Sequence, residues 1–519
     1  MLAKLGTYAL MGIDALPVEV EVDVTPINKE ENAYTIVGLP ETTVRESVFR
    51  VERAMVNSGI YRPTTKTIIN LAPAELPKQA AAFDLPIAIG LMVATGNMST
   101  DKLSQYAVVG ELALDGTVRP IKGALSMAIE CARLKKKGQT EVKGLILPRS
   151  NAAEAAVVSD IDVIPVDSLS QAIAFLSESL LIDPLECDME RWFSEASKYD
   201  IDFSDVRGQD MTKRAMLIAA AGYHNILMIG PPGSGKTMLA KRLPTILPTL
   251  TPEESIETTR IYSSIGEVSA DKPLMATRPF RAPHHTISEP GLVGGGSSPT
   301  PGEISLAHNG ILFLDELPEF NRKTLEVLRQ PLEEGKILIS RAQAHATFPA
   351  HFMLVAAMNP CPCGYRNDPR RDCHCSMPQV ERYINKISGP LLDRIDIHVE
   401  VPAVPYNELI SSRETENSDS LRKKVIAAHE IQVKRYARRK ILYNSQLTAR
   451  QIREFCPLNP ECQELMKSAI NDMGLSARAH DKILRLARTI ADLDSAPNIE
   501  SPHLMEAINY RTLDRDFWK

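Results

Sequence analysis

The segment 230–237 combines glycines, a lysine and a hydroxyl residue in an order that suits phosphate binding. An apolar run at 226–229 leads into the sequence GPPGSGKT, and a helical pattern follows from residue 238, as the G-x-x-x-x-G-K-T phosphate loop requires. Backbone N–H groups of such a loop converge on phosphates, while Lys236 is expected to reach the β- and γ-phosphates of ATP and Thr237 to bind Mg²⁺. The predicted cofactor-binding loop consists of Gly230, Pro231, Pro232, Gly233, Ser234, Gly235, Lys236 and Thr237.

Two later segments place polar residues directly after apolar runs. Asp315 and Glu316 follow the run 311–314, and Asn359 follows the run 352–358. Parallel sheets bind ligands at the carboxyl ends of their strands, so these side chains are expected near the phosphate loop. Asp315 is expected to hold Mg²⁺ through water, Glu316 to polarise the attacking water, and Asn359 to position that water.

Two arginines are further candidates for contact with the γ-phosphate. Arg394 lies in the segment GPLLDRID at 389–396, and Arg478 lies at the start of an apolar-periodic helical pattern. A guanidinium neutralises charge that develops during phosphoryl transfer, so Arg394 could reach the nucleotide of a neighbouring subunit in a ring. It could equally form a local ion pair with an adjacent aspartate. Arg478 is expected to clamp the nucleotide of its own subunit.

Four of the eight cysteines are concentrated in the segment 361–375. They form two C-x-C pairs, Cys361 with Cys363 and Cys373 with Cys375. Four thiolates suit a tetrahedral structural Zn²⁺. Because C-x-C is tighter than the usual C-x₂-C spacing, a ligand set that includes His374 stays open, as do free thiols and a redox function.

The composition excludes several classes of protein. Hydrophobic residues make up 44% and charged residues 24% of the 519 residues, which is the balance of a globular chain with sizeable cores. With 59 Lys and Arg against 65 Asp and Glu the formal charge is −6, so any contact with phosphates must come from local basic clusters. The longest apolar stretches fall short of the ~18 residues of a membrane span, and the N-terminus lacks the features of a secretory signal. We therefore expect a cytoplasmic protein with no membrane partner.

The pattern of apolar residues divides the chain into three blocks. Residues 1–182 alternate strand-like and helical runs, which indicates an α/β domain, and the polar stretch 183–205 suggests a linker. Residues 206–404 hold the phosphate-binding motifs and the cysteine insert 361–375, again in an α/β pattern. Residues 405–519 show helical periodicity without strand-like runs.

Taken in this order, the motifs resemble those of AAA+ ATPases, and within them the magnesium-chelatase-like group. The likeness extends to residues 281–286 (RAPHHT), 302–308 (GEISLAH), 339–342 (ISRA) and 389–399 (GPLLDRIDIHV). Within this group the chain resembles the bacterial ComM/YifB family over essentially its whole length. The resemblance implies an N-terminal Lon-protease-like α/β domain, a central AAA+ P-loop domain with a parallel sheet, and a C-terminal helical lid.

The same resemblance assigns roles to the candidate residues. Asn359 stands where the family has sensor 1, Arg394 where it has an arginine finger acting across subunits, and Arg478 where it has sensor 2. Residues 206–209 match the segment that borders the adenine. The resemblance implies ATP and Mg²⁺ as cofactors, a homo-hexameric ring, and an ATP-driven helicase that moves DNA branches in recombination, during natural transformation or repair.

The N-terminal block resembles the Lon protease in residues 83–88 (FDLPIA) and 110–121 (GELALDGTVRPI). The protease would have a serine at the position of Ile87 and a lysine near Leu125. Isoleucine has no hydroxyl and leucine no base, so both the nucleophile and its activator are missing. We expect a structural or DNA-holding role instead of proteolysis.

Three basic segments are candidates for contact with DNA. Residues 336–352 (KILISRAQAHATFPAHF) predict a β-hairpin that points into the pore in ring helicases of this group. Arg341 and His345 are the candidate phosphate contacts, which should make DNA binding salt-sensitive. Residues 278–286 are a candidate second pore loop, and the run 434–440 lies on a predicted helix. Each segment could equally be solvated or lie at an interface.

Two other functions share these motifs. A motor subunit that inserts Mg²⁺ into a porphyrin would carry the same ATPase residues, although the Lon-like domain and the cysteine insert argue against it. An ATP-gated scaffold for recombination proteins would need no translocation, although the presence of Glu316 and Arg394 argues for hydrolysis.

Overall fold

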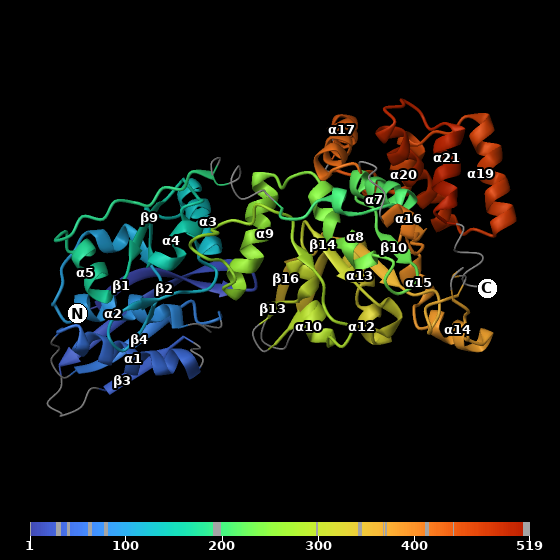
Figure 1. The fold of residues 1–519 in the computed structure, drawn as a ribbon. Helices are drawn as coiled ribbons and strands as arrows, with labels where there is room; N and C mark the ends of the chain where they lie inside the picture. Colours follow the sequence, from blue (N-terminus) through green and yellow to red (C-terminus); the bar gives the residue numbers. More distant parts are fainter. Residues whose placement is uncertain are drawn as a thin grey trace.

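The computed structural model describes most of the chain and has three parts. In Figure 1 the N-terminal domain, in blue and cyan, lies at one end, the C-terminal helices, in orange and red, lie at the other, and a mixed α/β core lies between them. This architecture confirms the predicted fold class. The described residues are 2–511 without 27–32, 39–41, 61–64, 77–80, 190–191, 193–198, 297–298, 341–344, 367, 369–370, 410–414, 438 and 440.

The N-terminal domain begins with a mainly antiparallel sheet in the order β1-β2-β4-β3. Alternate residues of β2 are buried because one face of this sheet packs against α2. Ten of the eleven residues of α2 are buried, so the longest apolar run of the sequence is a core helix. The elements are β1 (Leu2–Met11), β2 (Asp14–Pro26), β3 (Ala33–Val37), α1 (Thr42–Asn57), β4 (Thr65–Ala72) and α2 (Asp84–Ala94).

A second, parallel sheet in the order β5-β8-β9 completes this domain. Ile87 of α2 and Leu125 of α3 are both fully buried, so neither position faces solvent where a protease nucleophile must act. The remaining elements are β5 (Tyr106–Val108), β6 (Glu111–Leu112), β7 (Val118–Arg119), α3 (Ala124–Lys136), β8 (Gly144–Pro148), α4 (Arg149–Ala155), β9 (Asp162–Val166) and α5 (Leu169–Leu176).

The core contains a parallel sheet in the order β11-β14-β17-β10-β18. Its central strands are apolar throughout and fully buried, because helices cover both faces of a parallel sheet. Its strands are β10 (Ile226–Ile229), β11 (Phe280–Arg281), β14 (Ile311–Leu314), β17 (Met353–Met358) and β18 (Ile397–Glu400). The helices of the core are α7 (Asp210–Gly222), α8 (Lys236–Arg242), α9 (Pro252–Ile265), α10 (Glu289–Val293), α11 (Glu303–Leu306), α12 (Arg322–Glu326), α13 (Arg329–Glu334), α14 (Met377–Ile384) and α15 (Gly389–Leu392).

Two antiparallel hairpins project from this core. The larger one pairs β15 (Lys336–Ser340) with β16 (His345–Pro349), as the sequence predicts for this segment. Its strands alternate buried and exposed residues, so one face packs on the core and the other faces solvent. The smaller one pairs β12 (Gly294–Gly295) with β13 (Thr300–Pro301).

The C-terminal part consists of helices, among which α20 packs against α7, α17 and α21. Asp492 of α20 is buried and binds Arg435 of α17, with Nη1–Oδ2 2.9 Å, and Arg488 of its own helix, with Nε–Oδ1 3.1 Å. The helices are α16 (Tyr406–Leu409), α17 (Ser418–Tyr436), α18 (Ala449–Phe455), α19 (Pro460–Met473), α20 (Ala477–Leu493) and α21 (Ser501–Asn509). In the part of the chain that the structure describes, no helix is both long and apolar enough to cross a bilayer.

The N-terminal domain contacts the core through the turn between β1 and β2. Ile13 is buried in an apolar cluster of the core, and Arg260 of α9 pairs with Asp14 at 2.7 Å. Gly12 has a φ of +63°, and a Cβ atom there would lie 2.9 Å from the Cβ of Ala346 on β16. The turn can approach the hairpin this closely because glycine has no side chain.

Four stacked rings join the core to the C-terminal helices. Tyr223 stacks on His351 with centroids 5.1 Å apart and on Tyr443 at 4.9 Å, and Tyr443 stacks on His429 at 4.6 Å. The hydroxyl of Tyr223 donates to the carbonyl of Gly310, next to β14. Burial lowers the pKa of both histidines, to about 4 for His351, so both rings are neutral in the stack at neutral pH.

This stack predicts that acid weakens the contact between the core and the C-terminal helices α16–α21, which are called the lid below. An unfolded histidine has a pKa of about 6.5, so His351 binds a proton more readily when unfolded. The contribution of neutral His351 to the free energy of unfolding is complete above about pH 6.5. As the pH falls from there towards the pKa of the folded state, this contribution decreases by about 1.4 kcal/mol per pH unit. Calorimetry between pH 7 and pH 4 should show a smaller pH dependence for His351→Gln than for wild type. The exposed His345→Gln is the control, and equal slopes for wild type and His351→Gln would contradict the prediction.

Candidate active site

The phosphate loop lies between β10 and α8, and Lys236 at the start of α8 makes hydrogen bonds within it. Lys236 donates from Nζ to the carbonyl oxygens of Gly230 at 2.8 Å and Pro231 at 2.9 Å. Burial lowers the pKa of Lys236, and the nearby carboxylates of Asp315 and Glu316 oppose this. A lysine in this position has its charge directed into the loop, where a phosphate would bind.

The loop fits a phosphate group on two further observations. Gly233 and Gly235 have φ values of +76° and +92°, and no described atom lies within 4 Å of where their Cβ atoms would be. The buried Oγ of Ser234 has no hydrogen-bond partner among the described residues. Open backbone and an unsatisfied hydroxyl are what a phosphate-binding loop offers to its ligand.

The end of β14 meets the start of α8 on the predicted Mg²⁺ side of the site. Thr237 donates from Oγ1 to Oδ2 of Asp315 at 2.6 Å, and the other carboxylate oxygen of Asp315 accepts from the backbone N–H of Glu316 at 2.9 Å. A hydroxyl and a carboxylate at this distance can share one Mg²⁺. These two residues would hold the ion between the loop and the sheet.

Asn359 follows β17 and reaches the same lysine. Its Oδ1 accepts from Nζ of Lys236 at 3.3 Å, because β17 pairs in parallel with β10 and Ile229 lies opposite Met358. The amide is therefore within reach of the group that would bind the terminal phosphates. The structure brings together Lys236, Thr237, Asp315 and Asn359 at the carboxyl edge of the sheet.

Glu316 has a histidine partner that the sequence motifs alone do not assign. Nδ1 of His285 lies 3.4 Å from Oε2 of Glu316, and the ring of His285 packs near that of His284 with centroids 4.1 Å apart. Residues 284–285 follow β11, the neighbour of β14 in the sheet. The adjacent histidines after a short strand were the available signal, but only the sheet order shows that one of them meets the carboxylate.

Gln209 fixes the loop from the opposite side. Its Nε2 donates to the carbonyls of Pro402 at 2.5 Å and Ser234 at 3.4 Å. Gln209 has a φ of +63° and is buried. The segment 206–209 therefore lies against the phosphate loop.

Arg394 lies at the other edge of the sheet. It follows α15 and precedes β18, and its carbonyl accepts from Nδ2 of Asn225 at 3.0 Å, immediately before β10. The phosphate loop follows the opposite end of β10, about 13 Å away for a strand of four residues. The guanidinium of Arg394 pairs with Glu333 and donates to the carbonyl of Pro390 at 2.5 Å. The guanidinium thus forms an ion pair with Glu333 and not with an adjacent aspartate, and its side chain is only 12% exposed.

Arg478 lies beside Arg394 and not beside Lys236. Its Nη1 is 3.9 Å from Oδ2 of Asp393, and its side chain is 70% exposed. Arg478 and Arg394 line one cavity together with residues of α13 and α20, and no residue of the phosphate loop lines it. This position does not fit the expectation that Arg478 clamps the nucleotide of its own subunit, because the start of α20 packs at the amino edge of the sheet.

A buried ion network holds this arginine segment against the lid. Asp396 pairs with Lys482 of α20 at 2.9 Å and with Nδ1 of His224 at 3.2 Å, and Nε2 of His224 lies 2.8 Å from Oγ1 of Thr489. Burial alone would raise the pKa of Asp396, but the charge of Lys482 and the hydrogen bond to His224 hold that pKa well below its usual range. The carboxylate is therefore ionised and joins α20 to the segment that carries Arg394.

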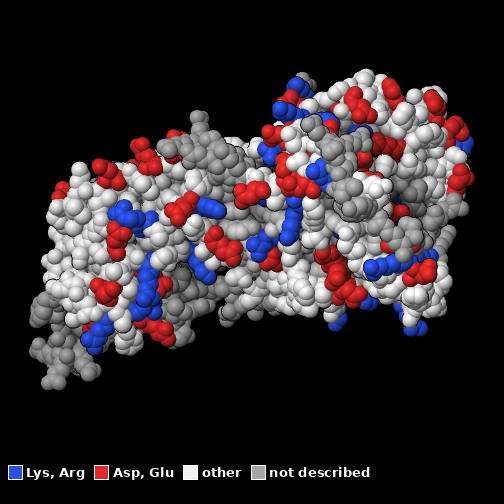
Figure 2. All heavy atoms as spheres, in the orientation of Figure 1, with Lys and Arg blue, Asp and Glu red and all other residues white. Residues whose placement is uncertain are grey.

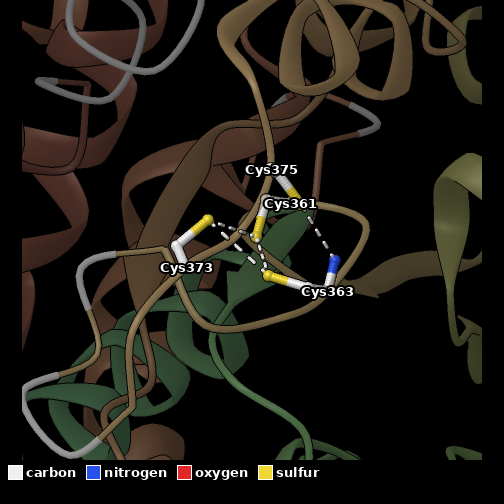
Figure 3. Close-up of side chains that lie close together, drawn as sticks. All are labelled: Cys361, Cys363, Cys373 and Cys375. Carbon is white, nitrogen blue, oxygen red and sulfur yellow. Dashed lines mark hydrogen bonds between the residues drawn. The ribbon is translucent and has the colours of Figure 1, made fainter.

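The four cysteines of the insert converge on one point (Figure 3). Their sulfur atoms all lie within 4.8 Å of one another, which is compact enough for one metal ion. His374 is exposed and does not belong to this group. The ligand set of four sulfurs is thus the one that the geometry supports.

The candidate DNA segments differ in how free their basic residues are. His345 is exposed on β16 and hydrogen-bonds Ser340 at 2.7 Å, and Arg341 lies outside the described residues. Arg278, at the start of the candidate second pore loop, is buried and donates to the carbonyls of Pro248 and Asn309, both at 2.7 Å. Within this candidate pore loop, the guanidinium of Arg278 therefore satisfies buried backbone groups and is not free to contact DNA.

The basic run 434–440 is partly neutralised by acidic partners. Arg435 pairs with the buried Asp492, and Arg439 pairs with Glu454 at 2.7 Å. Figure 2 shows basic and acidic side chains interspersed on the face that it presents, over the core and the C-terminal helices alike. A contact with DNA would therefore depend on a local element such as the hairpin.

Three family models together match most of the chain. The model described as "Magnesium chelatase, subunit ChlI" matches residues 202–409, "Subunit ChlI of Mg-chelatase" matches 20–151, and "Magnesium chelatase, subunit ChlI C-terminal" matches 415–511. Together with the parallel sheet and the phosphate loop at its carboxyl edge, these matches define an AAA+ protein of the magnesium-chelatase-like group. Such a protein implies ATP and Mg²⁺ as cofactors.

Relatives that align with almost the whole chain identify the family within this group. The chain is 44% identical to "Uncharacterized protein YifB" of Salmonella typhimurium and 43% identical to "Competence protein ComM" of Haemophilus influenzae, in each case over 99% of this chain and 98% of the relative. It is 24% identical to "Magnesium-chelatase subunit ChlI, chloroplastic" of Chlamydomonas reinhardtii over 46% of this chain and 62% of that protein. The chain belongs to the ComM/YifB family.

The geometry predicts that Glu316 acts in turnover and not in ATP binding. We expect Glu316→Gln to lower the turnover of ATP by about 10²- to 10⁴-fold, because an amide cannot accept a proton from water. The affinity for Mg-ATP should stay within about threefold of wild type, since Lys236 would still contact the phosphates and Thr237 and Asp315 would still hold Mg²⁺. Phosphate release and equilibrium binding of a fluorescent ATP analogue measure the two quantities. Glu319→Gln, an exposed neighbour, is the matched control, and normal turnover of Glu316→Gln would refute the role.

Proposed function

We propose that this protein is an ATP-driven DNA motor that works as a ring, most simply a homo-hexamer, in homologous recombination during natural transformation or DNA repair. The observation that carries the proposal is the position of the hairpin β15–β16 in the chain. It lies between β14, which precedes Asp315 and Glu316, and β17, which precedes Asn359, with α12 and α13 between β14 and the hairpin. Changes at the nucleotide would therefore reach the hairpin through these helices on one side and through β17 on the other.

The hairpin has the surface that contact with a nucleic acid backbone needs. Ile337 and Phe348 face inwards and are buried, while Ser340, His345 and Thr347 are exposed on the other face. Hydroxyl and imidazole groups are common partners of phosphate oxygens. Arg341 extends this set in the sequence and would supply the charge.

The positions of Lys236 and Arg394 support an assembly of several subunits. Lys236 follows the carboxyl end of β10, and Arg394 precedes the amino end of β18, which pairs in parallel with β10, so the two lie at opposite ends of these strands. A head-to-tail ring would bring the Arg394 side of one subunit to the phosphate loop of the next, and such contacts close into rings. Arg478, beside Arg394, would belong to the same shared site.

The relatives support a role with DNA. One of them, from Haemophilus influenzae, is named a competence protein, and competence is the state in which a bacterium takes up DNA. The match to magnesium-chelatase family models supports ATP hydrolysis, but it does so equally for a DNA motor and for a chelatase motor. An assay on DNA is therefore needed to separate the two.

A mixing experiment tests whether the active site is shared between subunits. We expect Lys236→Ala and Arg394→Ala each to abolish ATP hydrolysis, because each removes a phosphate contact from every interface. When equal amounts are mixed and reassembled, about a quarter of the interfaces regain both groups in a head-to-tail ring, and activity should return to about that fraction. The control variant Arg439→Ala removes an exposed arginine outside the site, and it should hydrolyse ATP without a partner variant. Lack of recovery in co-assembled mixtures would contradict a shared site.

Movement of a synthetic four-way DNA junction tests the motor itself. We expect wild-type protein with Mg-ATP to move the junction, and Lys236→Ala to be inactive. The double substitution Arg341→Ala and His345→Ala should stop movement, keep ATP turnover within about twofold, and reduce the dependence of log Kd on log salt by about 1 to 2. Lys467→Ala, on the exposed face of α19, is the control. ATP turnover without junction movement by wild type would favour a protein-remodelling or chelatase-type partner instead.

A further inference from the structure

We propose that the four cysteines hold one Zn²⁺ and that this metal centre braces the phosphate loop and Asn359, so that ATP turnover depends on it. The inference rests on the ATPase part of the proposed function and is independent of DNA. In this proposal the zinc site supports the catalytic residues, whereas a purely structural zinc site would stabilise only the insert itself.

The arrangement of the sulfur atoms suits a single tetrahedral ion. Sγ of Cys361 lies 3.3 Å from that of Cys363 and 3.6 Å from that of Cys373, and the Cys363–Cys373 distance is also 3.6 Å. A zinc ion bound by four sulfurs at about 2.3 Å separates them by about 3.8 Å. The sulfurs are too far apart for disulfides and too close together to surround the inorganic core of an iron–sulfur cluster.

Apart from the sulfur cluster, the described residues of the insert are joined by local contacts, such as that of Arg371 Nη1 with the hydroxyl of Tyr365 at 2.7 Å. Among its described residues 361–375 there is no helix or strand. The backbone N–H of Cys363 donates to Sγ of Cys375 at 3.4 Å, and that of Gly364 donates to the carbonyl of Cys361 at 3.0 Å. N–H groups directed at sulfur stabilise metal-bound thiolates. In Figure 3 the two C-x-C pairs approach each other from separate turns of the chain, which a shared ion would join.

The turn of the first cysteine pair touches the phosphate loop. Gly364 has a φ of +88°, and a Cβ atom there would lie 2.6 Å from Cδ and 2.9 Å from Cγ of Pro232. The same position lies 3.9 Å from Cγ of Asn359. The metal-binding turn therefore forms one wall behind the second proline of the loop, and only a glycine leaves room for this contact.

The other connection is through the chain itself. Cys361 lies two residues after Asn359 with a proline between them, and its side chain is fully buried. Asn359 in turn accepts from Nζ of Lys236. An ion that fixes Cys361 and Cys363 would therefore restrain both Asn359, whose amide would position water, and the phosphate loop.

The expected effect is on turnover more than on stability. Without the ion, four thiols at these distances lose their common ligand, and the turn no longer supports Pro232. Misplacement of a catalytic group by about 1 Å costs about 10²-fold in rate. We therefore expect a loss of about that size in ATP turnover, with overall folding retained because the core sheet does not include the insert.

The first experiment compares Cys373→Ser with Cys187→Ser, a half-buried cysteine outside the cluster. Metal analysis of purified full-length protein should give one zinc per chain for wild type and Cys187→Ser, and far less for Cys373→Ser. Protein loaded with Co²⁺ should show the intense visible absorption of a tetrahedral cobalt thiolate in the first two proteins only. Wild type without zinc and without this spectrum would overturn the metal site, whatever the protein does with ATP.

The second experiment tests the connection to the phosphate loop. Cys373→Ser and Gly364→Ala should both lose about 10²-fold in ATP turnover, although Gly364→Ala keeps all four thiolates and its zinc. Amide hydrogen exchange in residues 230–237 should become faster in both variants, a readout that does not require activity. Normal exchange and turnover in zinc-free Cys373→Ser would overturn the bracing role. If wild type hydrolysed no ATP, the proposed function would fail, while zinc content and exchange would still decide this inference.

Discussion

Parallel pairing of β10, β14 and β17 is the constraint on which the rest of this molecule depends. It puts the carboxyl ends of three strands side by side, so that Lys236, Asp315 and Asn359 meet although they are distant in sequence. The segment before β18 carries Arg394, and the parallel pairing of β18 with β10 puts this segment at the amino edge of the same sheet. One sheet therefore has a phosphate-binding edge and an arginine edge, and a ring of such sheets would alternate the two.

Buried polar contacts keep the lid in register with the arginine edge. The carboxylate of Asp396 binds both Lys482 and His224, and breaking one partner of a buried pair is costly because the other charge stays uncompensated. The stack of Tyr223, His351 and their two lid partners adds a directional contact nearby. The network of Asp396 thus joins the lid to the segment of Arg394, which explains why Arg478 at the start of α20 lies beside that segment.

The parts of the site that depend on local sequence could be predicted, and those that depend on packing could not. The phosphate loop, the acidic end of β14 and the cysteine cluster are each set by residues close together in the chain, and the hairpin follows from its alternation of apolar residues. The burial of Arg278, the meeting of His285 with Glu316 and the position of Arg478 depend on which strands and helices become neighbours. A basic residue in a sequence says nothing about its partners, and here Arg278 and Arg435 are committed to buried or acidic groups.

The contact of Gly12 with Ala346 has a mechanical consequence. The N-terminal domain is fixed to α9 by Arg260 and to the hairpin by a glycine turn. A displacement of β15–β16 relative to α9 would therefore either pull on the N-terminal domain or break the contact between Gly12 and Ala346.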